Sequence, residues 1–303
     1  MTALIGLVAV VVGGTDAFLL AYAGDADEVA LEDVIADFRS EASPDSSDSP
    51  RPASPSDATD APFGSPSAVP SPTANATEAP TGSPTMAPTP RPSASPTNTG
   101  LRRPVPGVYV YATEGGESVS LPGGSREYPS ETFGVVRHLD GCGWTMERKI
   151  LEQHEEKSTY CSMGSQLLQS RYETTIEFFG AREKEILVCD PPVIQGDLEA
   201  PSGSTRTGSC DGETVHSEGT ATFHELTTLT IGGQEVRAMH VTIEGVSSGE
   251  ATGTSRMELW AHAETGLPLK LIRWSESKTN RFGAGVTYTE SVTFTLTSLS
   301  PQG

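Results

Sequence analysis

One stretch near the C-terminus decides the fold: Val286-Thr287-Tyr288-Thr289-Glu290-Ser291-Val292-Thr293-Phe294-Thr295-Leu296. Apolar side chains alternate with threonines through most of its length. Because successive side chains of a strand point to opposite faces, this alternation predicts a strand with one apolar face and one threonine-rich face turned to water. Strands of this kind build half-buried sheets, which are typical of antiparallel pairing.

The same alternation recurs earlier in the chain, most clearly in residues 108–112, 239–243 and 257–261. The pattern predicts about ten strands and no helix after residue 107. We therefore expect residues 107–303 to form a mainly β domain, a curved antiparallel sheet or incomplete barrel, with a two-sheet sandwich as the alternative. The turn signals between the runs are Gly115-Gly116, Gly123-Gly124, Gly232-Gly233 and Gly283-Ala284-Gly285.

The residues before this domain have a different composition. Sixteen of the 23 prolines lie within residues 43–106, among Ser, Thr, Ala and Asp. Such a segment cannot bury enough apolar surface to offset the entropy of ordering it, so we predict a disordered Pro/Ser/Thr-rich stalk. Residues 25–42 are instead predicted to form a short amphipathic helix. Its apolar positions are Val29, Leu31, Val34, Ile35 and Phe38.

The N-terminus is apolar from Ala3 to Ala23, long enough to cross about 30 Å of hydrocarbon as a helix. We expect residues 1–24 to be a single transmembrane anchor that contacts the membrane through residues 3–23. The alternative is a cleaved signal peptide and a secreted product, because Ala21-Tyr22-Ala23 fits the small-residue cleavage pattern. Both interpretations place the domain outside the cytoplasm.

The cysteines support export. All four lie in the expected β domain: Cys142, Cys161, Cys189 and Cys210. An even number in an exported chain indicates disulfides, and the absence of a Cys-x-x-Cys pair disfavours the alternative, a zinc site. Strands on either side of a turn near Gln153 would bring Cys142 close to Cys161, which leaves Cys189 to pair with Cys210 across a Pro/Gly-rich connection.

The sequence offers little support for catalysis. A net charge of −20, from 20 Lys and Arg against 40 Asp and Glu, disfavours nucleic-acid binding. No P-loop, Gly-x-Ser-x-Gly or His-Glu-x-x-His motif occurs, since His154-Glu155 and His224-Glu225 both lack the second histidine. The six histidines have no ligand-like spacing, and we expect most of them at surface or edge positions. We therefore predict no enzyme activity, no cofactor and no metal site.

One hairpin carries a resemblance to a known family: Leu259-Trp260-Ala261-His262-Ala263-Glu264-Thr265-Gly266-Leu267-Pro268-Leu269-Lys270-Leu271. It resembles the Asp-x-x-Thr-Gly-Leu-Pro-Leu-Arg hairpin of lipoprotein-carrier-like proteins, which include LolA-type chaperones and the regulator RseB. Here Ala263 replaces the usual Asp, and Lys270 the frequent Arg. The resemblance implies a strongly curved, incomplete barrel around a hydrophobic cavity. The layout of anchor, helix, stalk and Cys-containing β domain also resembles a group of actinobacterial membrane-anchored extracytoplasmic proteins.

Two functions from different classes follow. The first is a membrane-anchored, non-catalytic binding module for an apolar or lipid-like ligand. The alternative is a sensor or protein-interaction ectodomain with a solid core, whose partner is a cell-envelope protein. An enclosed apolar cavity above about 300 Å³ would favour the first. The candidate ligand contacts are Trp144, Phe178, Phe179, Trp260, Leu269 and Trp274, although aromatic side chains also fill ordinary cores. If Trp260 and Trp274 alternate outward, they are surface aromatics or partner contacts instead.

Overall fold

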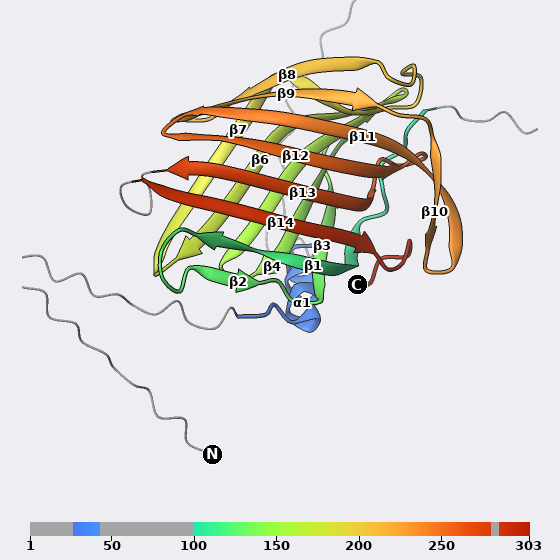
Figure 1. The fold of residues 1–303 in the computed structure, drawn as a ribbon. Coiled ribbons are helices and arrows are strands. Elements are labelled where there is room, and N and C mark those ends of the chain that lie inside the picture. Colours follow the sequence, from blue (N-terminus) through green and yellow to red (C-terminus); the bar gives the residue numbers. More distant parts are fainter. Residues whose placement is uncertain (1–26, 43–99, 280–284) are drawn as a thin grey trace, which may run out of the picture. The chain divides into compact units, whose positions relative to one another are not determined.

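The computed structural model describes residues 27–42, 100–279 and 285–303. Over these residues the chain forms one helix, α1, and a single 14-stranded antiparallel sheet (Figure 1). The elements are α1 (Leu31–Ala42), β1 (Gly107–Val119), β2 (Ser125–Glu127), β3 (Glu131–His138), β4 (Gly143–Leu151), β5 (His154–Met163), β6 (Gln166–Phe178), β7 (Ala181–Asp197), β8 (Thr205–Asp211), β9 (Val215–Phe223), β10 (Thr227–Ile231), β11 (Gln234–Gly249), β12 (Ala251–His262), β13 (Pro268–Thr279) and β14 (Val286–Leu296). The mainly β prediction is confirmed.

The sheet closes on itself, so the expected incomplete barrel is wrong. Strand β9 pairs with β8 on one side and with β11 on the other. This second pairing joins the two ends of the strand order and gives a closed barrel of 12 strands. Strands β2 and β10 lie off the ring, where they pair with β1 and β11. Closure satisfies the backbone edges that an open sheet would expose.

The ring is weakest between β7 and β8. Their ladder contains one residue pair, Val188 and Asp211. The disulfide between Cys189 and Cys210 lies directly beside that pair and ties the two strands together. Gly208 lets them approach, because a Cβ there would lie 2.5 Å from Cγ1 of Val193. A covalent bond and side-chain packing therefore replace most of the missing hydrogen bonds at this seam.

The other disulfide joins Cys142 to Cys161, so both predicted pairings are confirmed. Here the backbone ladder is long: β4 and β5 are paired from Gly143 opposite Cys161 to Leu151 opposite His154, with one irregularity between Lys149 and Leu151. The turn that joins them contains Gln153, as expected. This bridge reinforces a hairpin that is already paired along most of its length.

The alternation in β14 sorts its side chains as predicted. Its inward positions are buried and its threonines are more exposed. Two separate apolar clusters occupy opposite ends of this strand. The larger contains Val292, Phe294 and Leu296, together with Trp144, Met146, Ile150, Leu151, Tyr109 and Tyr111, and forms a solid core. The smaller consists of Val286, Tyr288, Val119 and Phe178, with Leu121, Ile176 and Phe179 packed against it.

The predicted amphipathic helix covers the outside of the barrel. Val34 of α1 is buried against Val108, Phe133 and Val135, the outward-facing positions of β1 and β3. An ion pair of 2.8 Å between Glu41 and Arg137 lies beside this contact. These outward apolar side chains would otherwise face water. The helix therefore explains why β1 and β3 have apolar residues on both faces.

Residues 100–106, expected as the end of the stalk, pack on the barrel. Leu101 is buried in the solid core, and Arg102 forms an ion pair of 2.6 Å with Glu264. The predicted membrane segment, residues 1–24, lies outside the described residues, as do stalk residues 43–99. In the part of the chain that the structure describes, no helix has the length and apolar character needed to cross a bilayer.

We predict that the two disulfides differ in their effect on the barrel. Each closes a loop of about 20 residues, so replacing either cysteine pair by serine should lower the free energy of unfolding by about 3 kcal/mol. Only the Cys189→Ser/Cys210→Ser variant should also speed amide exchange along β7 and β8, because a single backbone-paired residue pair joins these two strands. Hydrogen exchange by mass spectrometry tests this. Equal protection of β7 and β8 in the Cys142→Ser/Cys161→Ser variant and in the seam variant would contradict it.

Candidate ligand-binding cavity

The interior of the barrel contains a cavity of about 1030 Å³ that is partly open to solvent. This volume is just above the range of about 300–1,000 Å³ found for small-molecule sites. Strands β4 to β9 and β11 to β14 contribute to its lining. It adjoins the solid core through Tyr160, Leu259 and Leu271, which belong to both. The alternative of a solid interior is therefore excluded for the described part of the barrel.

Small side chains create this space. Five neighbouring strands, β8, β9, β11, β12 and β13, carry glycine or serine at inward positions, where the solid core has large apolar residues. One row around the ring follows the strand register directly, each residue opposite the next: Gly208, Gly219, Gly245, Ser255 and Ser275. Ser217, Ser247 and Ser277 line the cavity on the same strands. With no large side chain from this wall, the ring cannot be filled.

Aliphatic residues complete this side. Ile243 and Ala221 face the cavity from β11 and β9, and Val193 and Ile194 face it from β7. Ala221 also packs with Phe223 and Val241 behind the cavity surface. An apolar part of a ligand would gain about 25 cal/mol for each Å² of apolar surface it removes from water here.

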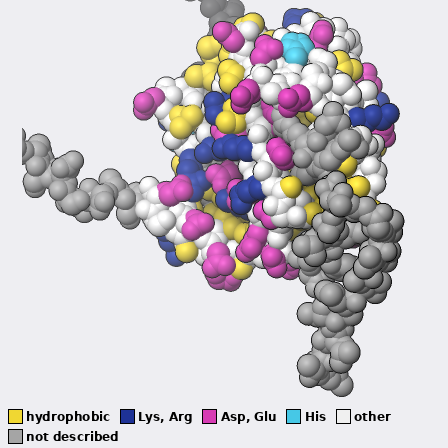
Figure 2. Space-filling model, turned by 90° about the vertical axis from the view of Figure 1, so that its left-hand side faces the viewer, with side chains coloured by type: hydrophobic (Ala, Val, Ile, Leu, Met, Phe, Trp, Pro, Cys, Tyr) yellow, Lys and Arg dark blue, Asp and Glu magenta, His cyan; other side chains and the backbone are white. Residues whose placement is uncertain are grey.

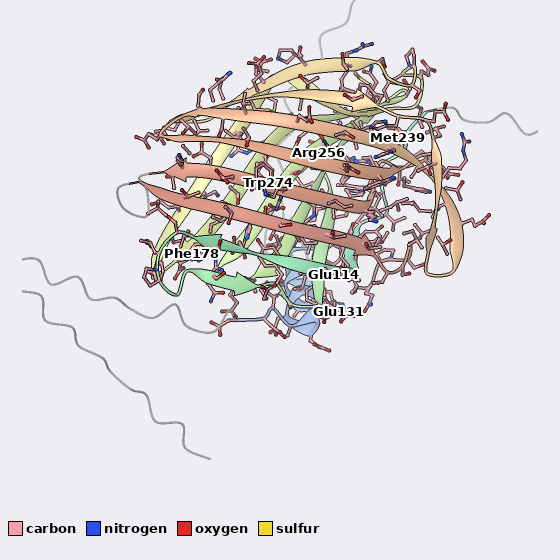
Figure 3. The ribbon with its side chains drawn as sticks, viewed as in Figure 1. Glu114, Glu131, Phe178, Met239, Arg256 and Trp274 are labelled. Atoms are coloured by element: carbon pink, nitrogen blue, oxygen red, sulfur yellow. A yellow bond between two sulfur atoms is a disulfide. The ribbon has the colours of Figure 1, made fainter. Side chains whose placement is uncertain are left out.

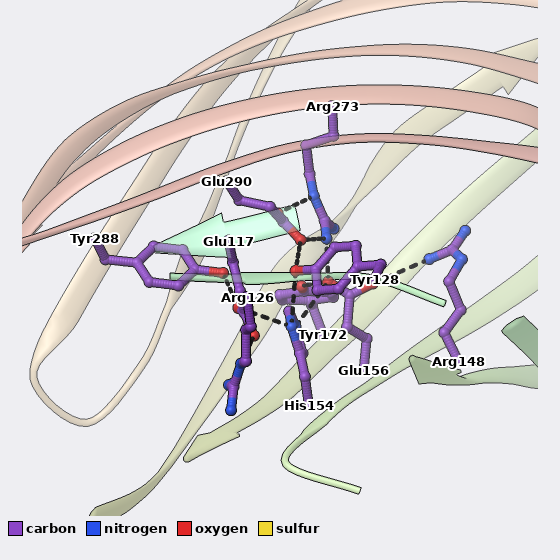
Figure 4. A network of polar contacts seen from close by, with 10 residues as sticks. All are labelled: Glu117, Arg126, Tyr128, Arg148, His154, Glu156, Tyr172, Arg273, Tyr288 and Glu290. Atoms are coloured by element: carbon purple, nitrogen blue, oxygen red, sulfur yellow. Dashed lines mark hydrogen bonds and ion pairs between the residues drawn. The ribbon is translucent and has the colours of Figure 1, made fainter. Parts of the chain in front are cut away.

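The opposite wall is charged. It belongs to a network of ten polar residues, seven of which line the cavity (Figure 4). Arg273 lies at its centre. It donates to both carboxylate oxygens of Glu290, over 2.7 and 2.8 Å, and forms an ion pair with Glu156. Tyr172 donates to Glu156 and Tyr128 donates to Glu290. Strands β2–β3, β5, β6, β13 and β14 thus meet through side chains inside the barrel.

His154 links this group to a third carboxylate, Glu117. Its Nδ1 lies 3.0 Å from Oε2 of Glu117, which also accepts a hydrogen bond of 2.7 Å from Tyr288. Arg126 donates to the other oxygen of Glu117 over 2.7 Å. Nε2 of His154 is 3.7 Å from Glu156, too far for a hydrogen bond, so that contact is purely electrostatic. Glu117 is therefore fully partnered although it is buried.

The surroundings of His154 and Glu117 shift both pKa values. Burial alone would lower the pKa of His154, but the attraction of Glu117 and the hydrogen bond to it raise the pKa to about 10. Burial would raise the pKa of Glu117, whereas His154 and Arg126 lower it to about 2. Both side chains are therefore charged near neutral pH, and buried charges remain stable only when they are paired in this way.

The network has one more positive charge than negative charges. Its carboxylates are Glu117, Glu156 and Glu290, and its cations are Arg126, Arg148, Arg273 and the protonated His154. The network thus holds three negative charges and four positive ones. The cavity is also lined by Glu183, Glu185 and Glu218 against Arg206, so the excess positive charge is local to the network, where it favours an anionic group over a cationic one.

Three side chains of the network also have the spacing of a metal site. His154, Glu156 and Glu290 offer ligand atoms that lie within 4.8 Å of one another. Arg273 already binds both carboxylates, and a protonated imidazole has no lone pair to donate. The arrangement holds a cation of its own, so we assign no metal to it.

Arg148 is the least satisfied member of the network. Its side chain is only 6% exposed, and it lines the cavity. It has one weak contact with a carboxylate, 3.4 Å from Nη1 to Glu156, and its Nε has no hydrogen-bond partner. Its guanidinium lies 5.6 Å from the ring centre of Phe294, at the edge of the solid core.

The residues predicted as ligand contacts lie elsewhere: none of the six lines the cavity. Trp144 and Leu269 are fully buried in the solid core, where Trp144 packs on Tyr160 and donates to Ser162. Phe178 and Phe179 belong to the smaller cluster, with the guanidinium of Arg126 over the ring of Phe178.

By strand alternation, Trp260 and Trp274 point outward, the case in which we expected surface aromatics or partner contacts. Figure 3 labels Trp274 on β13. Trp260 stacks on His240 at 4.4 Å, and His240 in turn stacks on His224 at 4.2 Å. Trp274 is 44% exposed. The inward neighbours of both tryptophans, Leu259, Leu271 and Arg273, line the cavity instead.

The charged wall was not predicted from the sequence. His154 was expected at a surface or edge position, but it is 1% exposed. Inward and outward positions of β5 are both polar: His154, Glu156 and Ser158 alternate with Glu155, Lys157 and Thr159. No hydrophobic alternation marks this strand, so the sequence gives no sign of which face is buried. Gly219 and Gly245 could have indicated the cavity from the sequence, because a glycine within a strand has no side chain to fill the interior.

No protein-family model matches the chain, and no curated protein sequence matches it. Among solved structures, the chain is similar to the hypothetical lipoprotein YmcC from Escherichia coli K12, with 14% identity and a TM-score of 0.30. The similarity covers 65% of this chain and 90% of that one. At this level it says nothing about ligand or activity.

The network predicts a pH profile for stability. The pKa of His154 rises from 6.5 to about 10 on folding, so its contribution is complete below pH 6.5 and is lost as pH rises through about 10. The pKa of Glu117 falls from 4.5 to about 2, so its contribution is complete above pH 4.5 and is lost as pH falls through about 2. Urea unfolding of the oxidised protein should therefore show maximal stability between about pH 4.5 and 6.5.

His154→Gln should remove the decline between pH 6.5 and 9, and His216→Gln, which changes an exposed histidine, should retain it. The buried tyrosines do not disturb this window, because their raised pKa values affect stability only above about pH 10. A wild-type stability that stays constant from pH 6.5 to 9 would show that His154 is not held as a cation.

Proposed function

We propose that this protein is an extracytoplasmic, membrane-associated and non-catalytic binding module that holds a small amphipathic ligand inside its barrel. The cavity of about 1030 Å³ carries this proposal. A closed ring with a solid core at one end and a ligand-sized space beside it is the arrangement of a carrier or receptor for a small molecule.

The two walls support an amphipathic ligand over a purely apolar one. One wall presents Gly, Ser and aliphatic side chains, and the other presents paired charges. The end of the barrel at which β11 turns into β12 and β6 into β7 shows basic and acidic side chains gathered together, with hydrophobic ones between them (Figure 2). A hydrocarbon chain alone would leave the charged wall without polar contacts.

Location outside the cytoplasm is part of this proposal. Two disulfides with no free cysteine among the described residues support an oxidising compartment. Anchoring through residues 3–23 rests on the apolar N-terminal sequence.

The exposed outer face of β13 favours a second role in contacting a cell-envelope protein. Trp274 and Ile272 are 44% and 37% exposed, and both lie on the outer face of this strand. This contact would accompany ligand binding and does not require a solid interior.

Ligand binding can be tested by filling the cavity. We expect the wild-type chain to bind a dansyl-labelled fatty acid saturably, with one molecule per barrel. Ser255→Phe places a benzyl group between Gly245 and Ser275, and should weaken binding about tenfold or more. Fluorescence titration of the oxidised protein measures the affinity.

The matched control is Thr254→Phe, which adds a similar side chain to the outer face one residue away. It should bind like wild type. If the fatty acid does not bind saturably, or if both phenylalanine variants bind like wild type, the cavity is not the site.

A further inference from the structure

Arg148 combines burial with unused hydrogen-bonding capacity. A guanidinium has five N–H donors, and leaving a buried donor without a partner is destabilising. The side chain of Arg148 is 6% exposed, yet its one carboxylate contact is 3.4 Å long and its Nε is unpaired. Arg273, the comparable residue of the network, has three short contacts with Glu156 and Glu290.

Glu156 has closer partners than Arg148, which contacts its Oε2 over 3.4 Å. Its Oε1 already accepts a hydrogen bond of 2.8 Å from Tyr172 and is paired with Arg273. Arg148 is thus the cation that the network carries in excess, and it faces the cavity.

The neighbouring polar groups could assist an anion. Ser158 lines the cavity two residues after Glu156 on β5, and its hydroxyl accepts from Gln169 over 3.1 Å, which leaves its own proton to donate. Gln195 donates to Gln169 over 2.7 Å and fixes the orientation of that amide. Ser158 lies opposite Met146, so it is a diagonal neighbour of Arg148 across the β4–β5 ladder.

We propose that Arg148 anchors the carboxylate of an amphipathic monoanion whose apolar part extends toward the aliphatic and Gly/Ser side of the cavity. The guanidinium matches a carboxylate in a two-point hydrogen-bonded pair. One added negative charge also balances the single excess positive charge of the network. A phosphate monoester would carry up to two charges and leave the wall negative, so the carboxylate fits better. This inference rests on the proposed function and specifies its ligand class.

The test compares a dansyl-labelled fatty acid with its methyl ester on the full oxidised chain. Wild type should bind the acid about 10- to 100-fold more tightly than the ester, the size of a charge-assisted hydrogen bond. Arg148→Met keeps the length of the side chain and removes its charge. It should reduce the acid to the affinity of the ester and leave ester binding unchanged.

Arg256→Met is the control for net charge. It removes a guanidinium from the outer face, where Arg256 pairs with Glu244 and Glu258, and it should keep the full preference for the acid. Arg148→Lys should retain part of the preference, which separates a charge effect from a folding defect.

The outcomes separate the two proposals. Equal binding of acid and ester by wild type, or a preference that survives Arg148→Met, would overturn the role of Arg148 while the cavity remains a binding site. Absence of saturable binding for both probes would instead overturn the proposed function.

Discussion

The number of strands in the ring determines how much of the barrel interior the side chains can fill. About eight strands give a barrel that side chains just fill, and a larger ring encloses more space. This barrel has 12 strands, so apolar residues from every strand cannot meet across its whole length. At one end, Trp144, Tyr109, Tyr111 and their neighbours fill the interior. Beside them the chain has Gly and Ser at inward positions, and the space stays open.

The open part of the interior accommodates charged side chains as well as apolar ones. Charged groups near the middle of the barrel are held by one another, and each carboxylate has two or more partners. Burial raises the cost of leaving any of them unpaired, and this cost shifts the pKa values of His154 and Glu117 in opposite directions. Groups with such shifts often lie at functional sites. Arg148 is the exception to this pairing: it has one weak contact with a carboxylate, and its Nε has no hydrogen-bond partner.

Local patterns predicted the local structure well. Alternation identified β14, cysteine spacing with hairpin register identified both disulfides, and helical periodicity identified α1. Closure could not be predicted, because the pairing of β9 with β11 depends on shape and not on a local signal. The aromatic residues chosen as ligand contacts proved to be core or outer-face residues, since size and hydrophobicity do not show which end of a barrel is filled. The residues that line the cavity are small, polar or aliphatic.

The most direct test of the account is an experimental structure of the oxidised chain purified from its own host. We expect a closed ring with density for a non-protein molecule between the Gly/Ser wall and the charged wall. The polar end of this molecule should lie beside Arg148. Side chains that meet across this space and leave no room for a ligand would contradict it.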